Sequence, residues 1–273
     1  FRAPITIKKV KKENKTVLPK LKKLKTKFIT KQPVDYILDY DTQEKLEDIN
    51  SYVDFDILID FLLDKPINIT EEKKLMPTYE LRTGIEINKE TGTTQERMLY
   101  TQNFIRLEEG GFYIKFNENV DLDFATVGGE GKLFVAKNSQ DFTKDFEKVK
   151  NQIKEKVREN EYFKIVLLTS TNAVPEIDGA RLIAKFIGKH ITYSGWMSFY
   201  KDKKNLPTRI YRLIPEGSVF YYKLEDKSKI DKIFERFWLK PSFLVKEYPY
   251  FDPNNTTGFG LSIIGITKME EQL

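Results

Sequence analysis

Alternation of apolar and polar residues predicts β-strands along most of the chain after residue 78. The strand-like runs are residues 79–87, 98–107, 112–116, 124–136, 163–169, 191–199, 208–213, 219–224 and 261–266. The run at 163–169 is apolar except for Lys164 and Thr169, which is typical of a strand buried in the middle of a sheet. Residues 88–97 are polar and contain Gly92, so they predict a long hairpin loop between the first two strands.

Three other segments repeat their apolar residues at the spacing of an amphipathic helix: 53–62, 141–159 and 229–239. Residues 179–189 fit either a short helix or a loop that leads into a strand. From residue 163 onward the order is close to the β-α-β-β-α-β ferredoxin-like unit, whereas the first half shows β-β-β-α. The two halves are compatible with two copies of one fold, which predicts the α+β class.

Composition excludes several classes of function. The 273 residues contain no cysteine and one histidine, which rules out disulfides, thiolate zinc sites, cysteine nucleophiles and metal sites with two histidines. A carboxylate magnesium site stays open, but we expect no cofactor. The sequence has no apolar run of about 18 residues and no signal peptide, so we expect a cytoplasmic protein without a membrane span. It begins at Phe1, which indicates processing, truncation or a partial sequence.

Charge is unevenly distributed. Residues 1–31 contain 12 Lys/Arg and one acid, Glu13, a net charge of +11. Residues 39–64 contain nine acids and one base, Lys45, a net charge of −8. The basic arm at residues 1–31 is either a phosphate-binding segment that releases counterions on binding or a mobile, solvated loop.

Glycine-containing motifs adjoin three of the predicted strands, at residues 127–132, 215–222 and 257–265. Glycine beside a strand marks a bulge, a positive φ or the close approach of another backbone, and a phosphate backbone is one candidate. Gly131-Lys132 lacks the upstream glycine of a P-loop. The spacing of Gly258, Gly260 and Gly265 differs from the dinucleotide-binding fingerprint.

Basic and aromatic residues are interleaved between positions 181 and 212. They are Arg181, Lys185, Lys189, His190, Tyr193, Trp196, Tyr200, Lys201, Lys203, Lys204, Arg209, Tyr211 and Arg212. Readers of single-stranded RNA combine a cationic groove with stacking rings. Alternatively, the aromatic residues belong to a strand core and the lysines to its solvated side. His190 has no G-x-S-x-G partner motif, so we interpret it as a surface or RNA-edge residue.

The ordered set of motifs resembles the subunit of the RAMP superfamily that caps the CRISPR RNA (crRNA) tag in type III-B (Cmr) complexes. The resemblance covers about residues 78–265. It rests on Arg82-Thr83-Gly84-Ile85, Thr91-Gly92-Thr93, Met98-Leu99-Tyr100, Val127-Gly128-Gly129-Glu130-Gly131, Leu167-Leu168-Thr169, Ser194-Gly195-Trp196, Pro215-Glu216-Gly217-Ser218-Val219, and Gly258-Phe259-Gly260 with Gly265. Tag-capping subunits of other type III subtypes are the alternative match.

The resemblance implies two ferredoxin-like (RRM-like, RAMP) domains, at residues 1–160 and 161–273. The first would carry the basic arm, the acidic helix and a hairpin insertion, and it lacks the leading strand and helix of the family. It also implies a non-catalytic, antiviral ribonucleoprotein subunit. Its partners would be the 5′ repeat-derived tag of crRNA, the large polymerase-like subunit, a backbone RAMP subunit and, indirectly, the target RNA. The hairpin loop at 88–97 would form a wedge beside the RNA.

On this basis the residues expected to bind RNA fall into groups. Gly128, Gly129 and Gly131 would admit the RNA backbone while Lys132 pairs with a phosphate, and Gly258 and Gly260 would form a second glycine loop. Arg82 and Arg97 would flank the wedge. The remaining expected contacts are Lys89, Arg181, Lys189, His190, Trp196, Arg209 and Phe259.

Two alternatives belong to other classes of function. One is an endoribonuclease of the same superfamily that processes repeat RNA with His190 and a tyrosine or lysine. The other is a protein-interaction module whose acidic helix docks a basic partner.

Overall fold

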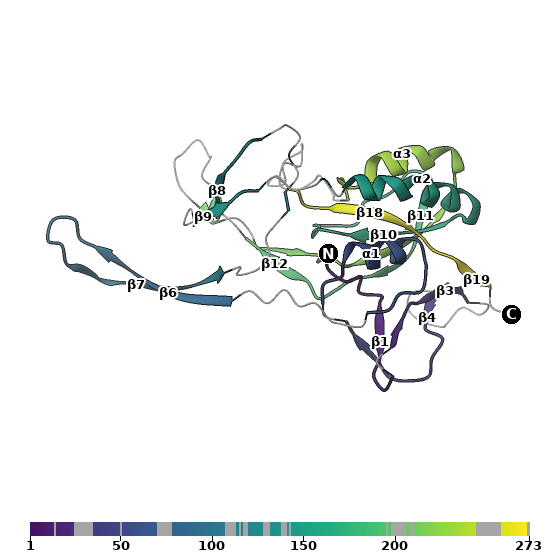
Figure 1. The fold of residues 1–273 in the computed structure, drawn as a ribbon, viewed down its shortest axis with the longest axis horizontal. Coiled ribbons are helices and arrows are strands. Elements are labelled where there is room, and N and C mark those ends of the chain that lie inside the picture. The colour runs from purple at the N-terminus through teal and green to yellow at the C-terminus, as the bar shows by residue number, and fades with distance from the viewer. Residues whose placement is uncertain are drawn as a thin grey trace. The chain divides into compact units, whose positions relative to one another are not determined.

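The computed structural model describes residues 1–13, 15–24, 35–49, 51–69, 78–106, 113–114, 116, 120–127, 132–137, 141, 143–194, 196–197, 206–207, 210–243 and 258–271. The chain forms two compact units (Figure 1). Unit 1 combines Phe1–Lys74 with Phe142–Leu273, and unit 2 is Leu75–Asp141. This grouping differs from the division expected at residue 160, because the N-terminal segment shares one hydrophobic core with the C-terminal half. The two ferredoxin-like domains at 1–160 and 161–273 stay a prediction.

A five-stranded antiparallel sheet forms the centre of unit 1. Its strands, in spatial order, are β11 (Ala180–Phe186), β16 (Val219–Leu224), β10 (Tyr162–Leu167), β18 (Leu261–Ile266) and β17 (Lys240–Pro241). Every residue of β10 is buried, which confirms the predicted central strand. The ambiguous segment at 179–189 contains the strand β11. Residues 168–179 join β10 to β11 without the helix that a β-α-β-β-α-β unit has there.

Helices cover both faces of this sheet, which explains why nearly every residue of its inner strands is buried (Figure 1). The helices are α1 (Phe55–Leu62), α2 (Thr143–Asn160) and α3 (Ile230–Phe237), the last preceded by a 3₁₀ turn at Lys227–Lys229. On one face, the α1 residue Leu62 lies directly over Gly265 of β18. On the other, the Ser262 hydroxyl donates to the Phe237 carbonyl of α3. The α+β class is therefore confirmed.

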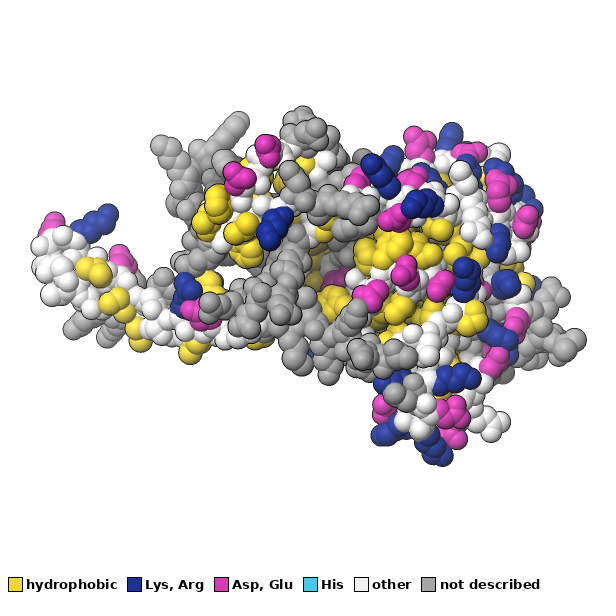
Figure 2. Space-filling model, in the orientation of Figure 1, with side chains coloured by type: hydrophobic (Ala, Val, Ile, Leu, Met, Phe, Trp, Pro, Cys, Tyr) yellow, Lys and Arg dark blue, Asp and Glu magenta, His cyan; other side chains and the backbone are white. Residues whose placement is uncertain are grey.

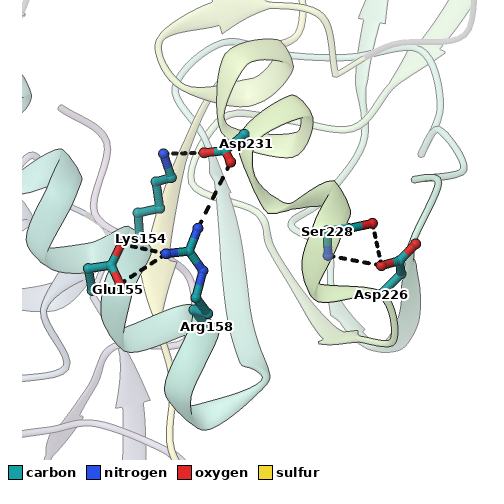
Figure 3. A network of polar contacts seen from close by, with 6 residues as sticks. All are labelled: Lys154, Glu155, Arg158, Asp226, Ser228 and Asp231. Carbon is teal, nitrogen blue, oxygen red and sulfur yellow. Dashed lines mark hydrogen bonds and ion pairs between the residues drawn. The ribbon is translucent and has the colours of Figure 1, made fainter.

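Polar contacts join α2 to α3 on their outer side (Figure 3). Lys154 forms an ion pair with Asp231, and Arg158 reaches the same carboxylate at 3.9 Å while donating to Glu155 at 2.9 Å. The hydrogen bond from Lys154 lowers the pKa of the Asp231 carboxyl. The network fixes the two helices side by side over one face of the sheet.

A buried ion pair anchors the end of α1 to the opposite face. Lys164 of β10 is fully buried, and its Nζ lies 3.2 Å from Oδ1 of Asp64. The same ammonium lies 4.0 Å from the centroid of the Phe61 ring. Burial lowers the pKa of Lys164, while the charge of Asp64 opposes that shift. This lysine is thus an internal anchor rather than a surface residue.

The N-terminal residues form two small sheets within unit 1. One contains β1 (Lys8–Val10), β2 (Lys15–Val17) and β5 (Leu46–Asp48), in the order β2-β1-β5. The other contains β3 (Lys20–Lys23), β4 (Tyr36–Asp39) and β19 (Met269–Glu271), in the order β19-β3-β4. The described part of the basic arm is therefore structured rather than a loop, and part of it pairs with the C-terminal strand β19.

Unit 2 consists of two hairpins. They are formed by β6 (Thr78–Ile87) with β7 (Thr94–Arg106) and by β8 (Phe124–Val127) with β9 (Lys132–Val135). The prediction of one bulged strand over 124–136 is wrong, because the chain reverses direction between Val127 and Lys132, which are antiparallel partners. The strand expected at 112–116 is also absent from its described residues, Tyr113, Ile114 and Phe116.

Short strands complete the fold near the end of the central sheet. They are β12 (Ile191–Tyr193) paired with β15 (Tyr211–Leu213), and β13 (Trp196–Met197) paired with β14 (Leu206–Pro207). The run predicted as one strand at 191–199 is thus divided between two ladders. None of the described helices is long and apolar enough to cross a membrane.

Candidate nucleic-acid interface

Four loops meet at one end of the central sheet because its strands are antiparallel and in register. β10 ends there opposite the starts of β16 and β18, and β11 ends there opposite the start of β16. The loops are residues 168–171, 187–190, 215–218 and 258–260. The sheet therefore brings together five of the residues expected to bind RNA, which are Lys189, His190, Gly258, Phe259 and Gly260. We call these four loops the glycine end of the sheet.

Hydrogen bonds from the 168–171 loop hold Gly258–Gly260 in place. The Thr169 hydroxyl donates to the Gly258 carbonyl at 2.7 Å and accepts from the Leu261 N–H at 2.8 Å. The Gly260 N–H donates to the Ser170 carbonyl at 2.8 Å. Both glycines have positive φ, +74° at Gly258 and +72° at Gly260, which side chains disfavour.

Gly258 differs from Gly217 and Gly265 in facing open space. A Cβ atom placed on Gly258 would have no atom of the described residues within 4 Å. A Cβ on Gly217 would lie 2.8 Å from the Ala3 carbonyl oxygen, and one on Gly265 would lie 2.9 Å from the Leu62 Cα. The close approach at Gly217 and Gly265 is thus made by the protein's own backbone. Only Gly258, of these three, leaves room for a ligand.

Aromatic residues lie beside this opening. The Phe259 ring meets the Tyr193 ring edge-to-face, with centroids 5.2 Å apart, and packs against buried Tyr211 and Leu213. Tyr193 is 41% exposed. Tyr193 lies opposite Tyr211 in the β12–β15 ladder. An exposed ring next to a glycine turn can stack a base while the turn faces the backbone.

The charged residues at the glycine end have mixed signs. Lys189 and Arg212 are exposed, whereas Glu216 accepts a hydrogen bond from the Ser170 hydroxyl at 2.9 Å. His190 is exposed, and its Nδ1 lies 3.2 Å from the Leu213 carbonyl oxygen. That contact orients the ring through Nδ1, so any chemistry at His190 would use Nε2.

Arg181 lies at the opposite end of the sheet, so it does not join this site. It is near the register pair Ala180–Leu224, and its Nε donates to Glu225 at 2.7 Å. This hydrogen bond raises the pKa of Arg181. Trp196 lies in β13, and the described structure does not extend to its side chain or to Arg209.

The residues expected to contact RNA in unit 2 lie on its hairpins. Arg82 donates to Glu80 at 2.9 Å and lies over the Phe104 ring, and Lys89 is exposed in the β6–β7 turn. Arg97 lies in β7 and Lys132 in β9, with side chains outside the description. Gly128, Gly129 and Gly131 lie outside the described residues altogether, so their predicted role is untested.

One face of each unit 2 hairpin is apolar and exposed (Figure 2). Tyr79, Leu81, Ile85 and Leu99 share a face of the β6–β7 ribbon, since Ile85 is the register partner of Leu99. On β8–β9, Phe124, Leu133 and Val135 are exposed in the same way. Two-stranded ribbons are marginally stable alone in water, so these hairpins depend on further contacts for support.

Ion pairs within the chain occupy much of the basic arm. Its lysines lie against acids of the segment at residues 39–48 and against Glu270 of β19, with the two charges interspersed on the surface (Figure 2). The pairs are Lys8–Asp48, Lys11–Glu47, Lys12–Glu44, Lys20–Asp41, Lys20–Glu270 and Lys22–Asp39. The prediction of a phosphate-binding arm is therefore weakened for these lysines, because their charge is balanced by acids that the strand pairing of β1 with β5 and of β3 with β4 places opposite.

Sequence reasoning missed the hydroxyl residues that shape the site. Thr169, Ser170 and Thr171 begin two residues after the end of the buried strand β10 at Leu167, and each hydroxyl bonds to a different loop. A run of small hydroxyl residues just after a buried strand is the signal that points to them. Their partners depend on the strand order and could not be found from spacing.

A comparison with protein families gives a match over nearly the whole chain. A family model described as CRISPR-associated protein (Cas_Cmr3) matches residues 3–267. No curated protein sequence matches the chain. The matched span includes both compact units and the four loops at the glycine end of the sheet.

Proposed function

The chain belongs to the Cas_Cmr3 family of CRISPR-associated proteins, which makes it a Cmr-type subunit of a type III-B complex, and from this premise we propose that it binds RNA without cleaving it. The RNA is the 5′ repeat-derived tag of crRNA. The proposed protein contacts are the large polymerase-like subunit and a backbone RAMP subunit. The target RNA would be reached only indirectly, through the guide.

The observation that carries the proposal is the open glycine turn at Gly258. The turn faces space where a side chain would meet no atom of the described residues. Its Phe259 contacts the exposed ring of Tyr193, and Lys189 lies in another loop at the same end of the sheet. Single-stranded RNA is bound by such a combination of close backbone approach, stacking ring and phosphate-binding cation. The central sheet would then serve as the platform of the C-terminal ferredoxin-like domain, with the residues 168–179 replacing its first helix.

A processing nuclease is the rival function. It would use Nε2 of His190 as the base or acid, since Nδ1 contacts the Leu213 carbonyl, so this contact does not decide between the two functions. Product analysis on a denaturing gel separates the two functions. Cleavage of repeat RNA that disappears in His190→Ala would favour the nuclease over the tag-binding subunit.

The binding experiment compares two short RNAs, one with a CRISPR-type 5′ tag and one scrambled, on the full chain assembled with its large partner. We expect preference for the tag, no cleavage, and affinity that falls steeply with salt. Lys189→Ala should weaken tag binding and reduce the salt slope by about one. The matched control is Lys232→Ala, an exposed lysine on α3 away from the glycine end. Equal losses in both variants, or equal affinity for both RNAs, would contradict the proposal.

A further inference from the structure

The turn at Gly258–Leu261 is built in an unusual way. In an ordinary β-turn the carbonyl of the first residue accepts a hydrogen bond from the N–H of the fourth. Here the Thr169 hydroxyl stands between these two groups, donating to the Gly258 carbonyl at 2.7 Å and accepting from the Leu261 N–H at 2.8 Å. The side chain of another loop therefore replaces the closing bond of the turn.

Two backbone hydrogen bonds hold the third residue of the turn, Gly260. The Gly260 N–H donates to the Ser170 carbonyl at 2.8 Å, and its carbonyl accepts from the Phe243 N–H at 3.0 Å. Gly260 occupies the third position with φ of +72°, as a type II turn requires. These contacts fix the third residue. The fourth residue is also held by its carbonyl, which accepts from the Leu168 N–H at 2.8 Å, whereas the first residue, Gly258, is held by the Thr169 hydroxyl among the contacts described.

We propose that Thr169 is a positioning residue that holds the Gly258 turn open for the phosphodiester backbone of a bound RNA. The inference rests on the proposed RNA-binding function and adds a residue to it. Without the hydroxyl, the Gly258 carbonyl and the Leu261 N–H lose their shared partner and close toward each other. The open space at Gly258 and the ring of Phe259 then move together, because both belong to this turn.

Three variants of Thr169 and one remote control test this role. Thr169→Val keeps the shape of the side chain and removes the hydroxyl, whereas Thr169→Ser keeps the hydroxyl. Thr16→Val is the control, because the Thr16 hydroxyl also bonds to backbone, accepting from the Ile69 N–H at 3.1 Å, in a sheet remote in sequence from the turn. Thr169→Asn has a donor and an acceptor on a longer side chain, so it tests whether the distance between the Gly258 carbonyl and the Leu261 N–H matters.

We expect Thr169→Val to weaken tag binding about tenfold, the value of one lost hydrogen bond, and Thr169→Ser to stay within about threefold of wild type. Thr16→Val should lower the melting temperature comparably while leaving tag affinity unchanged. Amide hydrogen exchange at Leu261 should become faster in Thr169→Val and not in Thr169→Ser. Thr169→Asn should resemble Thr169→Val.

The outcomes separate this proposal from the function on which it rests. If Lys189→Ala weakens tag binding and Thr169→Val does not, the positioning role is wrong and the RNA site stands. If neither variant alters binding while wild type binds the tag, the RNA lies elsewhere on the protein, so the site at Gly258 and the positioning role are wrong while tag binding stands. If wild type does not prefer the tag, the proposed function itself is wrong. If Thr16→Val reduces affinity as much as Thr169→Val, the effect is one of general stability and the positioning role is again refuted.

Discussion

Replacing Asp64 with asparagine tests how α1 is fastened to the central sheet. Asp64 has φ of +57°, a conformation that asparagine adopts as readily as aspartate. The change therefore removes the charge and leaves the backbone unstrained. What remains is the ammonium of Lys164, fully buried in β10, with a neutral amide oxygen where a carboxylate stood at 3.2 Å.

The expected cost follows from the surroundings of the pair. Breaking a buried ion pair by removing one partner costs about 3–5 kcal/mol. The lower end applies here, about 3 kcal/mol, because the amide still accepts a hydrogen bond and solvent screens a partly exposed partner. The side chain of Asp64 is 20% exposed and that of Lys164 is 2% exposed. Lys164→Met should cost less, under about 1.5 kcal/mol, because the carboxylate it leaves without a partner, Asp64, is partly exposed and can be solvated by water.

Urea denaturation at pH 7 of wild type, both single variants and the double variant completes the cycle. Once Lys164 is methionine, Asp64→Asn should cost less than about 1 kcal/mol, because no buried charge is left without a partner. If Asp64→Asn lowered the free energy of unfolding by the same amount in wild type and in Lys164→Met, that result would refute the reasoning. So would an Asp64→Asn variant that is as stable as wild type.

Three further predictions concern the same packed interior. Raising the pH from 7 toward 10 should stabilise wild type relative to Lys164→Met in urea titrations. The reason is that burial lowers the pKa of Lys164 in the folded protein below its ordinary 10.5. At pH values between the folded and the unfolded pKa, the unfolded chain binds more protons than the folded one, so stability rises with pH. A constant difference would contradict this. Gly265→Ala should cost about 1–3 kcal/mol in thermal unfolding, because its Cβ would lie 2.9 Å from the Leu62 Cα. An unchanged melting temperature would contradict this and show that α1 can shift away from the sheet without loss of stability. Gly217→Ala should also destabilise the protein, since φ is +80° and the new Cβ would meet the Ala3 carbonyl oxygen at 2.8 Å, and faster proteolysis of the N-terminal segment would report it.

The periodic apolar pattern predicts the inner elements well because burial on both faces leaves a strong signal. The predicted strands at 219–224 and 261–266 coincide with β16 and β18, and the predicted helix at 141–159 with α2, shifted by one or two residues. The segment at 179–189 is ambiguous because β11 is an edge strand with a half-exposed pattern. Its pairing with β16 decides its conformation, and that pairing is a tertiary contact.

The glycine end of the sheet was predictable only in part, for a related reason. Lys189 and Gly258 are separated by 69 positions, and they lie at the same end of the sheet because β11, β16, β10 and β18 pair in one particular order. Motif spacing identifies Gly258–Gly260 as a special turn, but it carries no information on Thr169, which reaches the turn from another strand. The basic arm shows the same limit, since its net charge of +11 is visible in sequence and its ion pairs with residues 39–48 are not.

Glycine motifs next to strands have two physical causes, and this protein contains both. At Gly217 and Gly265 the missing side chain makes room for Ala3 and Leu62, so each glycine stabilises the packing of a distant segment on the sheet. At Gly258 the same absence opens toward space. A substitution at the first two positions should therefore act on stability with or without RNA. A substitution that fills the space at Gly258 should act on RNA binding once the strain of its positive φ is controlled for, and asparagine, which tolerates that φ, is the suitable replacement.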